Sequence, residues 1–508
     1  MRLNLSTAAV GIVALSLAPG AQSQSDRSAR GLAQQAAAAL GGEAKLRALS
    51  RISLSGISVL YQREQSERPE GPWLPTFTEF TDVRDLGAST VWRTARTRGF
   101  VTENDTAWSA ESSSIVKEGV AFRASNGTIS AAQMPWDLGA LPPDLGPEHA
   151  VIAALDAPDL HTEPDIQLHG SPHHVLAFTH RRARVRVILA APTVMPKAVE
   201  ITHTRPFDTY WAPWGDVTQR VTFAAWLIEP EGIRFPRVWE YSTDGVVDGA
   251  VDLTRVRLTA PQASAETDVS SDALDAAVSS RRRVADLPLG DTRRSPVELA
   301  PGIVKLPANF DIVEVKQDDG TVIIEAPLTP AYSQKVIDDA ARRFPGLPIK
   351  AVVTTSDAWP HIGGIREYVA RRIPVYALDL NVPILQRLVA AKYESEPDAL
   401  ARAPKPPDWR VVSSRTTVGS GRNRLELLPL RTVTGERQMM AYFPALQLLY
   451  TSDLFTIRDG QVFLPQMVGE GVAAAARDRL DVKRAFGMHY DVLPWRTVTD
   501  STDVKAYR

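Results

Sequence analysis

The residues best suited to chemistry lie in a strand-like run and in the turn that follows it. Residues 349–364 read IKAVVTTSDAWPHIGG: an apolar, β-branched run, a short polar turn, and then His361-Ile-Gly-Gly opening a helical pattern. The chain has nine histidines, and only His361 and His489 lie after residue 203. It has no cysteine, which excludes disulfides, thiolate catalysis and cysteine metal ligands. Imidazole chemistry in the second half of the chain therefore depends on two residues.

This stretch resembles the metal-binding loop of the metallo-β-lactamase fold, which that family writes as T-H-x-H-x-D-H-x-G-G. Ser356 and Ala358 stand where the family has its first two histidines, and Pro360 stands at its aspartate position. Only the last histidine of the motif is kept, as His361. The resemblance implies the fold of that family, with a metal motif that is half erased.

Two later segments resemble other parts of the same family. MMAYFPALQLLYTSDLF resembles the strand pair that leads to its metal-bridging aspartate, here Asp453. FGMHYDVLPW resembles the strand end that carries its C-terminal histidine, here His489. The opening hairpin around Asp318-Asp319-Gly320 is similar too, so the resemblance spans residues 297–495.

The resemblance implies at most one metal ion per chain. The family binds two zinc ions, and the ligands of the first are absent here, since the later loop 430–435 (LRTVTG) has no histidine. The second set keeps His361, Asp453 and His489. Two imidazoles and one carboxylate, with water in the fourth position, suit a catalytic Zn ion, and Fe(II) accepts the same ligands. Such an ion lowers the pKa of its water to about 7.

Each candidate ligand also has a structural interpretation, in which no metal is bound. Asp453 can cap a helix that follows its strand, and His489 can be a hydrogen-bonded buried histidine. Asp357, beside a lost ligand position, could replace it by a local shift. Glu325 lies where the family has an acid that orients a ligand histidine, and Thr355 is expected to be a hydrogen-bonding residue at a strand end.

The first half of the chain offers weaker candidates. Several histidines of this half suggest a metal site: His161, His169, His173, His174, His180 and His203. However, His169, His173 and His174 fall around a Gly-Ser-Pro hairpin and are expected to be solvated turn residues. Trp211 and Trp214, in the loop TYWAPWGD, could line the rim of an apolar pocket or pack at the edge of a sheet.

These residues are positioned by two folded regions of different type. Apolar residues have helical spacing over 28–47. Short segments of alternating apolar and polar residues follow, separated by Gly, Pro, Asn and Asp. Together they predict a β-rich domain over 24–260, a curved antiparallel half-barrel. Its strand order resembles the lipoprotein-carrier-like half-barrels of bacterial envelopes. A linker is predicted over 261–296, with one short helix at 272–284, then a metallo-β-lactamase-like αβ/βα sandwich over 297–500 and a tail over 501–508. The predicted fold class is α+β.

The first residues have the pattern of a signal peptide. Arg2 precedes an apolar stretch from Ala8 to Ala18, and Ala21-Gln22-Ser23 supplies the small residues that signal peptidase reads. The stretch is shorter than the ~20 apolar residues of a membrane span, and no later segment is apolar enough for one. We predict a signal peptide over 1–23 and a periplasmic or secreted protein.

The resemblance and the composition together leave two classes of function open. A net charge of −2 gives no electrostatic case for nucleic acid as a partner, which leaves a small-molecule or lipid-like substrate. One hypothesis is an exported hydrolase that attacks an ester, amide or lactone with metal-bound hydroxide. The alternative is a catalytically inactive binding protein of the cell envelope, in which side chains fill the metal pocket. The sequence does not determine the oligomeric state.

Overall fold

The computed structural model describes most of the chain after residue 27. The described ranges are 28–62, 74–99, 108–125, 128–132, 146–208, 210–260, 268–291, 293–307, 311–458, 461–463 and 465–501. The predicted signal peptide therefore lies outside the described residues, as does all but the first residue of the predicted tail. No helix in the described ranges is long and apolar enough to cross a membrane.

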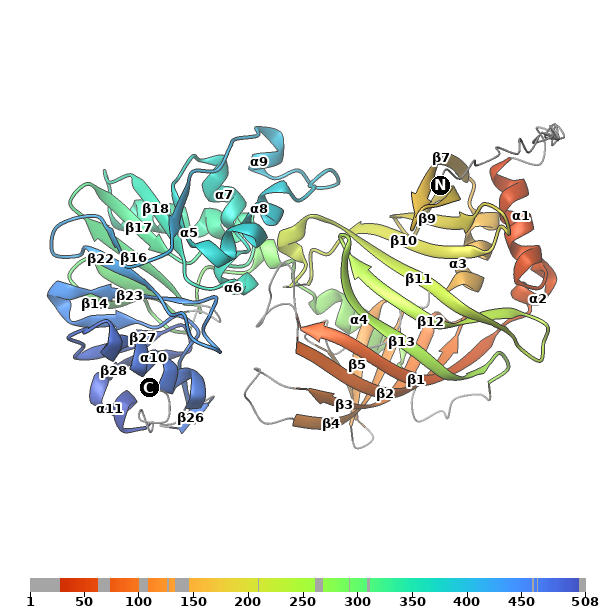
Figure 1. Ribbon diagram of the computed structural model, residues 1–508, viewed down its shortest axis with the longest axis horizontal. Coiled ribbons are helices and arrows are strands. Elements are labelled where there is room, and N and C mark those ends of the chain that lie inside the picture. Colours follow the sequence, from red (N-terminus) through yellow and green to blue (C-terminus); the bar gives the residue numbers. More distant parts are fainter. Residues whose placement is uncertain are drawn as a thin grey trace, which may run out of the picture.

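The first half is built on one curved antiparallel sheet of 13 strands (Figure 1). The chain runs as two meanders, and its first strand pairs with its last, so that β1 and β13 lie in the middle of the sheet. The strands are β1 (Arg51–Gln62), β2 (Leu74–Asp85), β3 (Thr90–Gly99), β4 (Trp108–Lys117), β5 (Val120–Ser125), β6 (Thr128–Ala131), β7 (His161–Leu168), β8 (Ser171–His180), β9 (Ala183–Ala190), β10 (Pro196–Thr204), β11 (Asp216–Ile228), β12 (Arg234–Thr243) and β13 (Val246–Arg257).

Helices cover part of this sheet and complete its core. Ser28 caps α1 (Ala29–Leu40) by accepting a hydrogen bond from the Gly31 N–H, and α2 (Glu43–Arg47) follows. α3 (Pro147–Asp156) connects β6 to β7 and packs against α1. Apolar side chains of α1 and α3 share one core with strand residues such as Phe178, Phe223 and Trp239. The predicted helix and half-barrel are confirmed, with the helix divided in two at Gly41.

The segment between the halves packs against both of them. α4 (Ser271–Ser280) buries Leu274 and Ala277 against β4 and β5 of the first half. The short helix η6 (Val284–Asp286) buries Val284 in the second half, where the Lys335 ammonium donates to the carbonyls of residues 285 and 287. A helix is present in the predicted range 272–284, but it ends at Ser280. The boundaries of the predicted domains stay a prediction.

The second half is a sandwich of two sheets. One has seven strands, β14 (Val297–Ala300), β15 (Ile303–Leu306), β16 (Ile312–Gln317), β17 (Gly320–Ile324), β18 (Ile349–Thr354), β19 (Val375–Leu378) and β20 (Trp409–Val412). The other has six, β21 (Thr416–Val418), β22 (Leu425–Pro429), β23 (Met439–Phe443), β24 (Leu448–Tyr450), β27 (Arg484–Gly487) and β28 (Tyr490–Pro494). A separate hairpin is formed by β25 (Thr456–Arg458) and β26 (Gln461–Phe463).

The buried clusters show four layers. One apolar cluster joins the inner faces of the two sheets. A second lies between the first sheet and its helices, α5 (Pro330–Arg343), α6 (Trp359–Ile362), α7 (Ile365–Ala370), α8 (Val382–Ala390) and α9 (Ala399–Arg402). A third lies between the second sheet and α10 (Pro465–Arg477) and α11 (Trp495–Asp500). The predicted α+β class and αβ/βα sandwich are confirmed.

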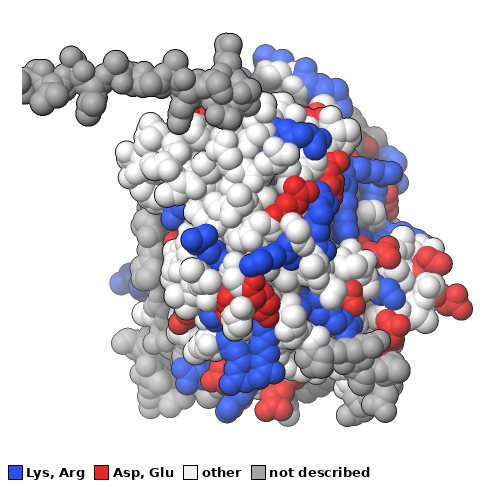
Figure 2. Space-filling view, turned by 90° about the vertical axis from the view of Figure 1, so that its right-hand side faces the viewer, with Lys and Arg blue, Asp and Glu red and all other residues white. Residues whose placement is uncertain are grey.

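Charge is mixed on the surface of the first half. On the end of the molecule that carries α1 and α2, acidic and basic side chains lie side by side next to an uncharged area (Figure 2). The contacts include the pair between Arg47 and Asp156, at 2.6 Å.

Candidate functional site

The three predicted site residues lie together at one edge of the sandwich. His361 is in α6, after β18; Asp453 follows β24; and His489 lies in the turn between β27 and β28. The Nε2 atom of His361 is 2.7 Å from Oδ2 of Asp453, and Nε2 of His489 is 2.7 Å from Oδ1 of the same carboxylate. Because each residue follows a strand, the strand ends bring them together.

Glu325 completes this group from the end of β17. Its Oε2 lies 2.8 Å from Nδ1 of His361, so the imidazole is held between two carboxylates. The contact agrees with the predicted role of Glu325 as an acid that orients this histidine. Glu325 has a φ of 82°, in the left-handed region that is unfavourable for a side chain with a Cβ. We call Glu325, His361, Asp453 and His489 the histidine cluster.

Two hydroxyl groups satisfy the other oxygen of Glu325, Oε1. Tyr450 donates to Oε1 at 2.9 Å, and the Thr355 hydroxyl donates to the same oxygen. The Thr355 hydroxyl also lies 2.6 Å from the Ser452 hydroxyl. Ser452 has a φ of 54°. The prediction for Thr355 is confirmed. Tyr450 and Ser452 were not predicted, because Tyr450 reads as one more apolar residue of its strand.

The charges of the cluster stabilise one another. Burial alone would lower the pKa of His361, but the charges of Asp453 and Glu325 and their hydrogen bonds raise it well above 6.5. Burial would raise the pKa of Asp453, and His361 and His489 together hold it well below its usual value. The imidazole of His361 is fully buried. Both ring nitrogens of His361 face carboxylate oxygens, and this environment favours the protonated imidazole.

This arrangement does not fit a single metal ion. Ligand atoms that share an ion with bonds of ~2.0–2.2 Å lie roughly 3–4 Å apart, whereas both histidines contact Asp453 at 2.7 Å, on different oxygens. Among the described residues, no group of three His, Asp or Glu side chains is arranged to hold a metal ion.

The positions of the lost ligands are filled by local structure. Ser356 accepts a hydrogen bond from the Ala358 N–H, and Ala358 is the N-cap of α6, with Pro360 in its first turn. All three are buried. Asp357 lies 3.9 Å from Arg437. Its carboxylate therefore lies beside Arg437.

The weaker candidates in the first half lie on a different sheet. His169 is an exposed turn residue, as predicted. The prediction for His173 is wrong, because this residue lies in β8 and its side chain is buried. Its Nδ1 lies 2.8 Å from the Ser171 carbonyl. Burial next to Arg205 lowers the pKa of His203 to about 4.

The tryptophan loop between β10 and β11 is a contact between the halves. Trp214 packs on the core of the sandwich, and the Arg387 guanidinium lies 5.2 Å from the centroid of its ring. The Asp216 N–H donates to the Lys392 carbonyl at 2.7 Å. Gly215, with a φ of 70°, approaches so closely that a Cβ there would lie 2.2 Å from the same carbonyl. Trp211 is half-buried against Tyr210 and Trp214.

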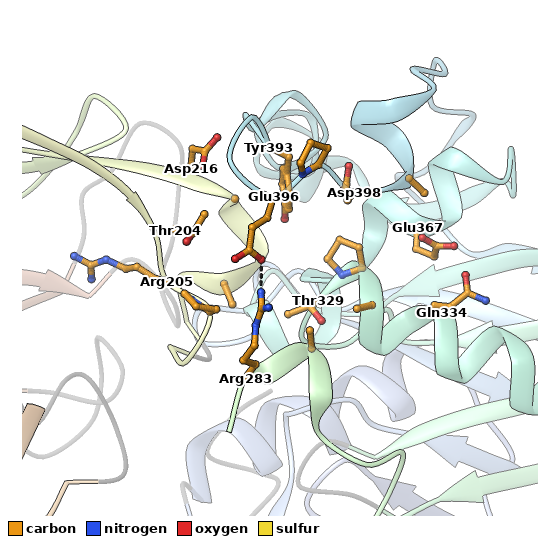
Figure 3. A pocket seen from close by; sticks show the side chains of 18 of the residues that line it. Thr204, Arg205, Asp216, Arg283, Thr329, Gln334, Glu367, Tyr393, Glu396 and Asp398 are labelled. Atoms are coloured by element: carbon orange, nitrogen blue, oxygen red, sulfur yellow. Dashed lines mark hydrogen bonds and ion pairs between the residues drawn. The ribbon is translucent and has the colours of Figure 1, made fainter. Parts of the chain in front are cut away.

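A cavity of about 480 Å³ opens beside this loop (Figure 3). Its walls come from the β10–β11 loop, from η6, from the start of α5 and from the loop between α8 and α9. Neither Trp211 nor Trp214 lines it, although Ala212 and Gly215 of the same loop do. The residues of the histidine cluster do not line it either.

Solved structures similar to this chain include alkylsulfatases and metallo-β-lactamases. They include a stereoselective inverting sec-alkylsulfatase from Pseudomonas sp. (17% identity, 44% of this chain, TM-score 0.32). They also include the DIM-1 metallo-β-lactamase (11% identity, TM-score 0.32), whose similarity covers 42% of this chain and 96% of that enzyme. A metallo-β-lactamase from Pontibacter korlensis matches at 13% identity, with 42% of this chain and 99% of that chain covered and a TM-score of 0.32.

The match spans less than half of the alkylsulfatase, 43% of its length. No family model and no curated protein matches the sequence. The strand pairings and buried clusters of this chain itself show its four-layer architecture.

Proposed function

We propose that the chain is a non-catalytic binding protein, with a sandwich of metallo-β-lactamase type whose metal position has become a salt-bridged structural centre. The observation that carries this proposal is the environment of His361. Both of its ring nitrogens lie within 2.8 Å of a carboxylate, and its imidazole is fully buried. A side chain held in this way positions loops at the strand ends and presents no free atom to a substrate.

A metal-dependent hydrolase of esters, amides or lactones is the second candidate. It is favoured by His489, whose side chain is 30% exposed, and by Oδ1 of Asp453. This buried oxygen lies 2.7 Å from His489 but accepts no hydrogen bond of good geometry, so a lone pair remains for another partner. One Zn or Fe ion, held by His361, Asp453 and His489, would require the carboxylate and the imidazoles to move apart.

Metal content separates the two candidates. Protein purified without chelators is loaded with Zn²⁺ or, under anaerobic conditions, with Fe²⁺, then dialysed and analysed by mass spectrometry. We expect no stoichiometric metal in the natural chain or in His489→Ala, and a lower melting temperature for His489→Ala because the contact of its imidazole with the Asp453 carboxylate is lost. One ion per chain that disappears in His489→Ala would contradict the structural centre and favour the metal-dependent candidate. His169→Ala, at an exposed turn, controls for loose binding to surface histidines.

We also propose that the protein is exported and matures by cleavage after Ser23. The support is the charged, apolar and small-residue order of residues 1–23. Expression of the full chain in a Gram-negative host should yield a periplasmic form whose first residue is Gln24. Recovery only in the cytoplasm with residue 1 intact would contradict this proposal.

A further inference from the structure

The cavity between the halves combines apolar walls with three arginines. Apolar residues form much of its surface: Pro206, Ala212, Ala285, Pro330, Ala331 and Pro397. Arg205, Arg283 and Arg402 also line it. Its volume of about 480 Å³ lies within the range of about 300–1,000 Å³ that is usual for small-molecule sites.

Three acidic groups that line the cavity are already engaged. Asp216 accepts from the backbone N–H groups of residues 394 and 395, at 2.5 and 3.0 Å. Asp398 forms two hydrogen bonds with Arg366, at 2.6 and 2.9 Å, and Glu367 binds Arg371 at 2.7 Å. Asp398 and Glu367 are therefore paired with arginines outside the cavity, whereas Asp216 is held by backbone N–H groups alone.

The guanidinium of Arg283 has capacity for another acceptor. It forms an ion pair with Glu396, drawn as a dashed line in Figure 3, and both side chains are about half exposed, at 43% and 51%. The buried Nε of Arg283 has no hydrogen-bond partner. Exposed ion pairs are weak, and a carboxylate with two oxygens could satisfy both nitrogens of the guanidinium fork.

We propose that this cavity binds a small aliphatic carboxylate, whose head group pairs with Arg283 in place of Glu396 and whose apolar body lies against the proline and alanine walls. Because residues from both halves line the cavity, a bound ligand would bridge them. The proposal goes beyond the proposed function: it concerns a different part of the molecule and holds whether or not the histidine cluster binds a metal.

Calorimetric titration of the full chain with octanoate tests this assignment. We expect one saturable site for octanoate, and no saturable binding of acetate, which lacks the body, or of octylamine, which carries the opposite charge. Arg283→Gln should weaken octanoate binding about tenfold, as expected when a charged hydrogen-bonded pair is lost. Glu396→Gln should strengthen it, because the competing carboxylate is removed.

The matched control is Arg282→Gln, at the exposed neighbour of Arg283, which should leave octanoate binding unchanged. The opposite effects of Arg283→Gln and Glu396→Gln separate a ligand contact from a general loss of structure, which would weaken binding in both. Absence of saturable octanoate binding would overturn the proposal. So would equal binding of octylamine, or octanoate binding that Arg283→Gln leaves unchanged.

Discussion

Each half of the chain buries a cluster of charged side chains, and the two clusters differ in how their charges are partnered. In the sandwich, the ring nitrogens of His361 and the carboxylates of Glu325 and Asp453 face opposite charges within 2.8 Å. In the half-barrel, the Arg84 side chain is only 1% exposed, yet none of its three guanidinium nitrogens forms a hydrogen bond. Glu148, on α3, is also buried, and neither of its oxygens accepts one.

The difference follows from the elements that carry the residues. Loops at strand ends can turn side chains toward a common point, and residues at positive φ, such as Glu325 and Ser452, contribute to this. Within a sheet, the register fixes the neighbours. Asp82 lies opposite Arg93 and binds it at 2.7 and 3.0 Å, whereas the cross-strand neighbours of Arg84 are Ile52 and Val91. Arg84 is therefore left with Asp82 at 3.8 Å and the ring of Trp239.

The largest effect is expected from Glu325→Gln. This substitution keeps the shape of the side chain but removes the charge that faces Nδ1 of His361, which leaves a buried cation with one partner fewer. Removing one member of a buried ion pair costs about 3–5 kcal/mol. We expect the free energy of unfolding to fall by about 3 kcal/mol, because Gln keeps one acceptor. Urea unfolding at pH 7 measures it. Asp338→Asn, at an exposed carboxylate of α5, should change little, and equal effects of the two would contradict a structural histidine cluster.

A smaller effect, one that depends on pH, is expected from His361→Gln. The pKa of His361 is raised in the folded state, well above 6.5, so protonation favours folding. The stability that it contributes is fully present below pH 6.5 and is lost as the pH rises toward the folded-state pKa. The difference in unfolding free energy between the natural chain and His361→Gln should therefore shrink between pH 6.5 and 9. A difference that grows with pH would show a neutral imidazole, and His169→Gln should give no such trend.

The sequence predicted the fold better than the chemistry of the site. Alternating apolar residues report which face of a strand is buried, so the curved sheet and the sandwich could be predicted from the sequence alone. The positions of His361, Asp453 and His489 at strand ends also follow from the order of the elements. Their meeting at one carboxylate agrees with that prediction.

The role of these residues depends on features that no residue pattern records. Whether Asp453 contacts His361 directly or through an ion is decided by about 1 Å in the separation of their side chains. Tyr450 and Ser452 enter the network through a strand register and a positive φ, neither of which the sequence reveals. The cavity beside Arg283 is likewise formed by segments that are far apart in sequence.

Limited proteolysis tests whether the two clusters belong to independent units. Arg281 and Arg282 are exposed between α4 and η6, so trypsin should cleave there. The fragment that begins near Val284 should resist further digestion, because Val284 packs into the core of the sandwich. Gel electrophoresis and mass spectrometry identify the products. Digestion of both halves at the same rate would mean that they unfold as one unit, and that the predicted domain boundary in 261–296 is wrong.

The smallest effect on stability is expected from Glu148→Gln in the half-barrel. Its sign is opposite to that of Glu325→Gln in the sandwich. Burial raises the pKa of Glu148 above 4.5, and Arg84 only partly opposes this. A carboxyl group with a raised pKa in the folded state destabilises the fold as the pH rises above its unfolded value. Glu148→Gln should therefore increase the free energy of unfolding at pH 8, and the gain should vanish toward pH 4.5. Glu79→Gln, at an exposed position of β2, should show no such trend. A loss of stability at pH 8 would instead mean that Glu148 is ionised and balances Arg84, in which case the two clusters would be partnered alike.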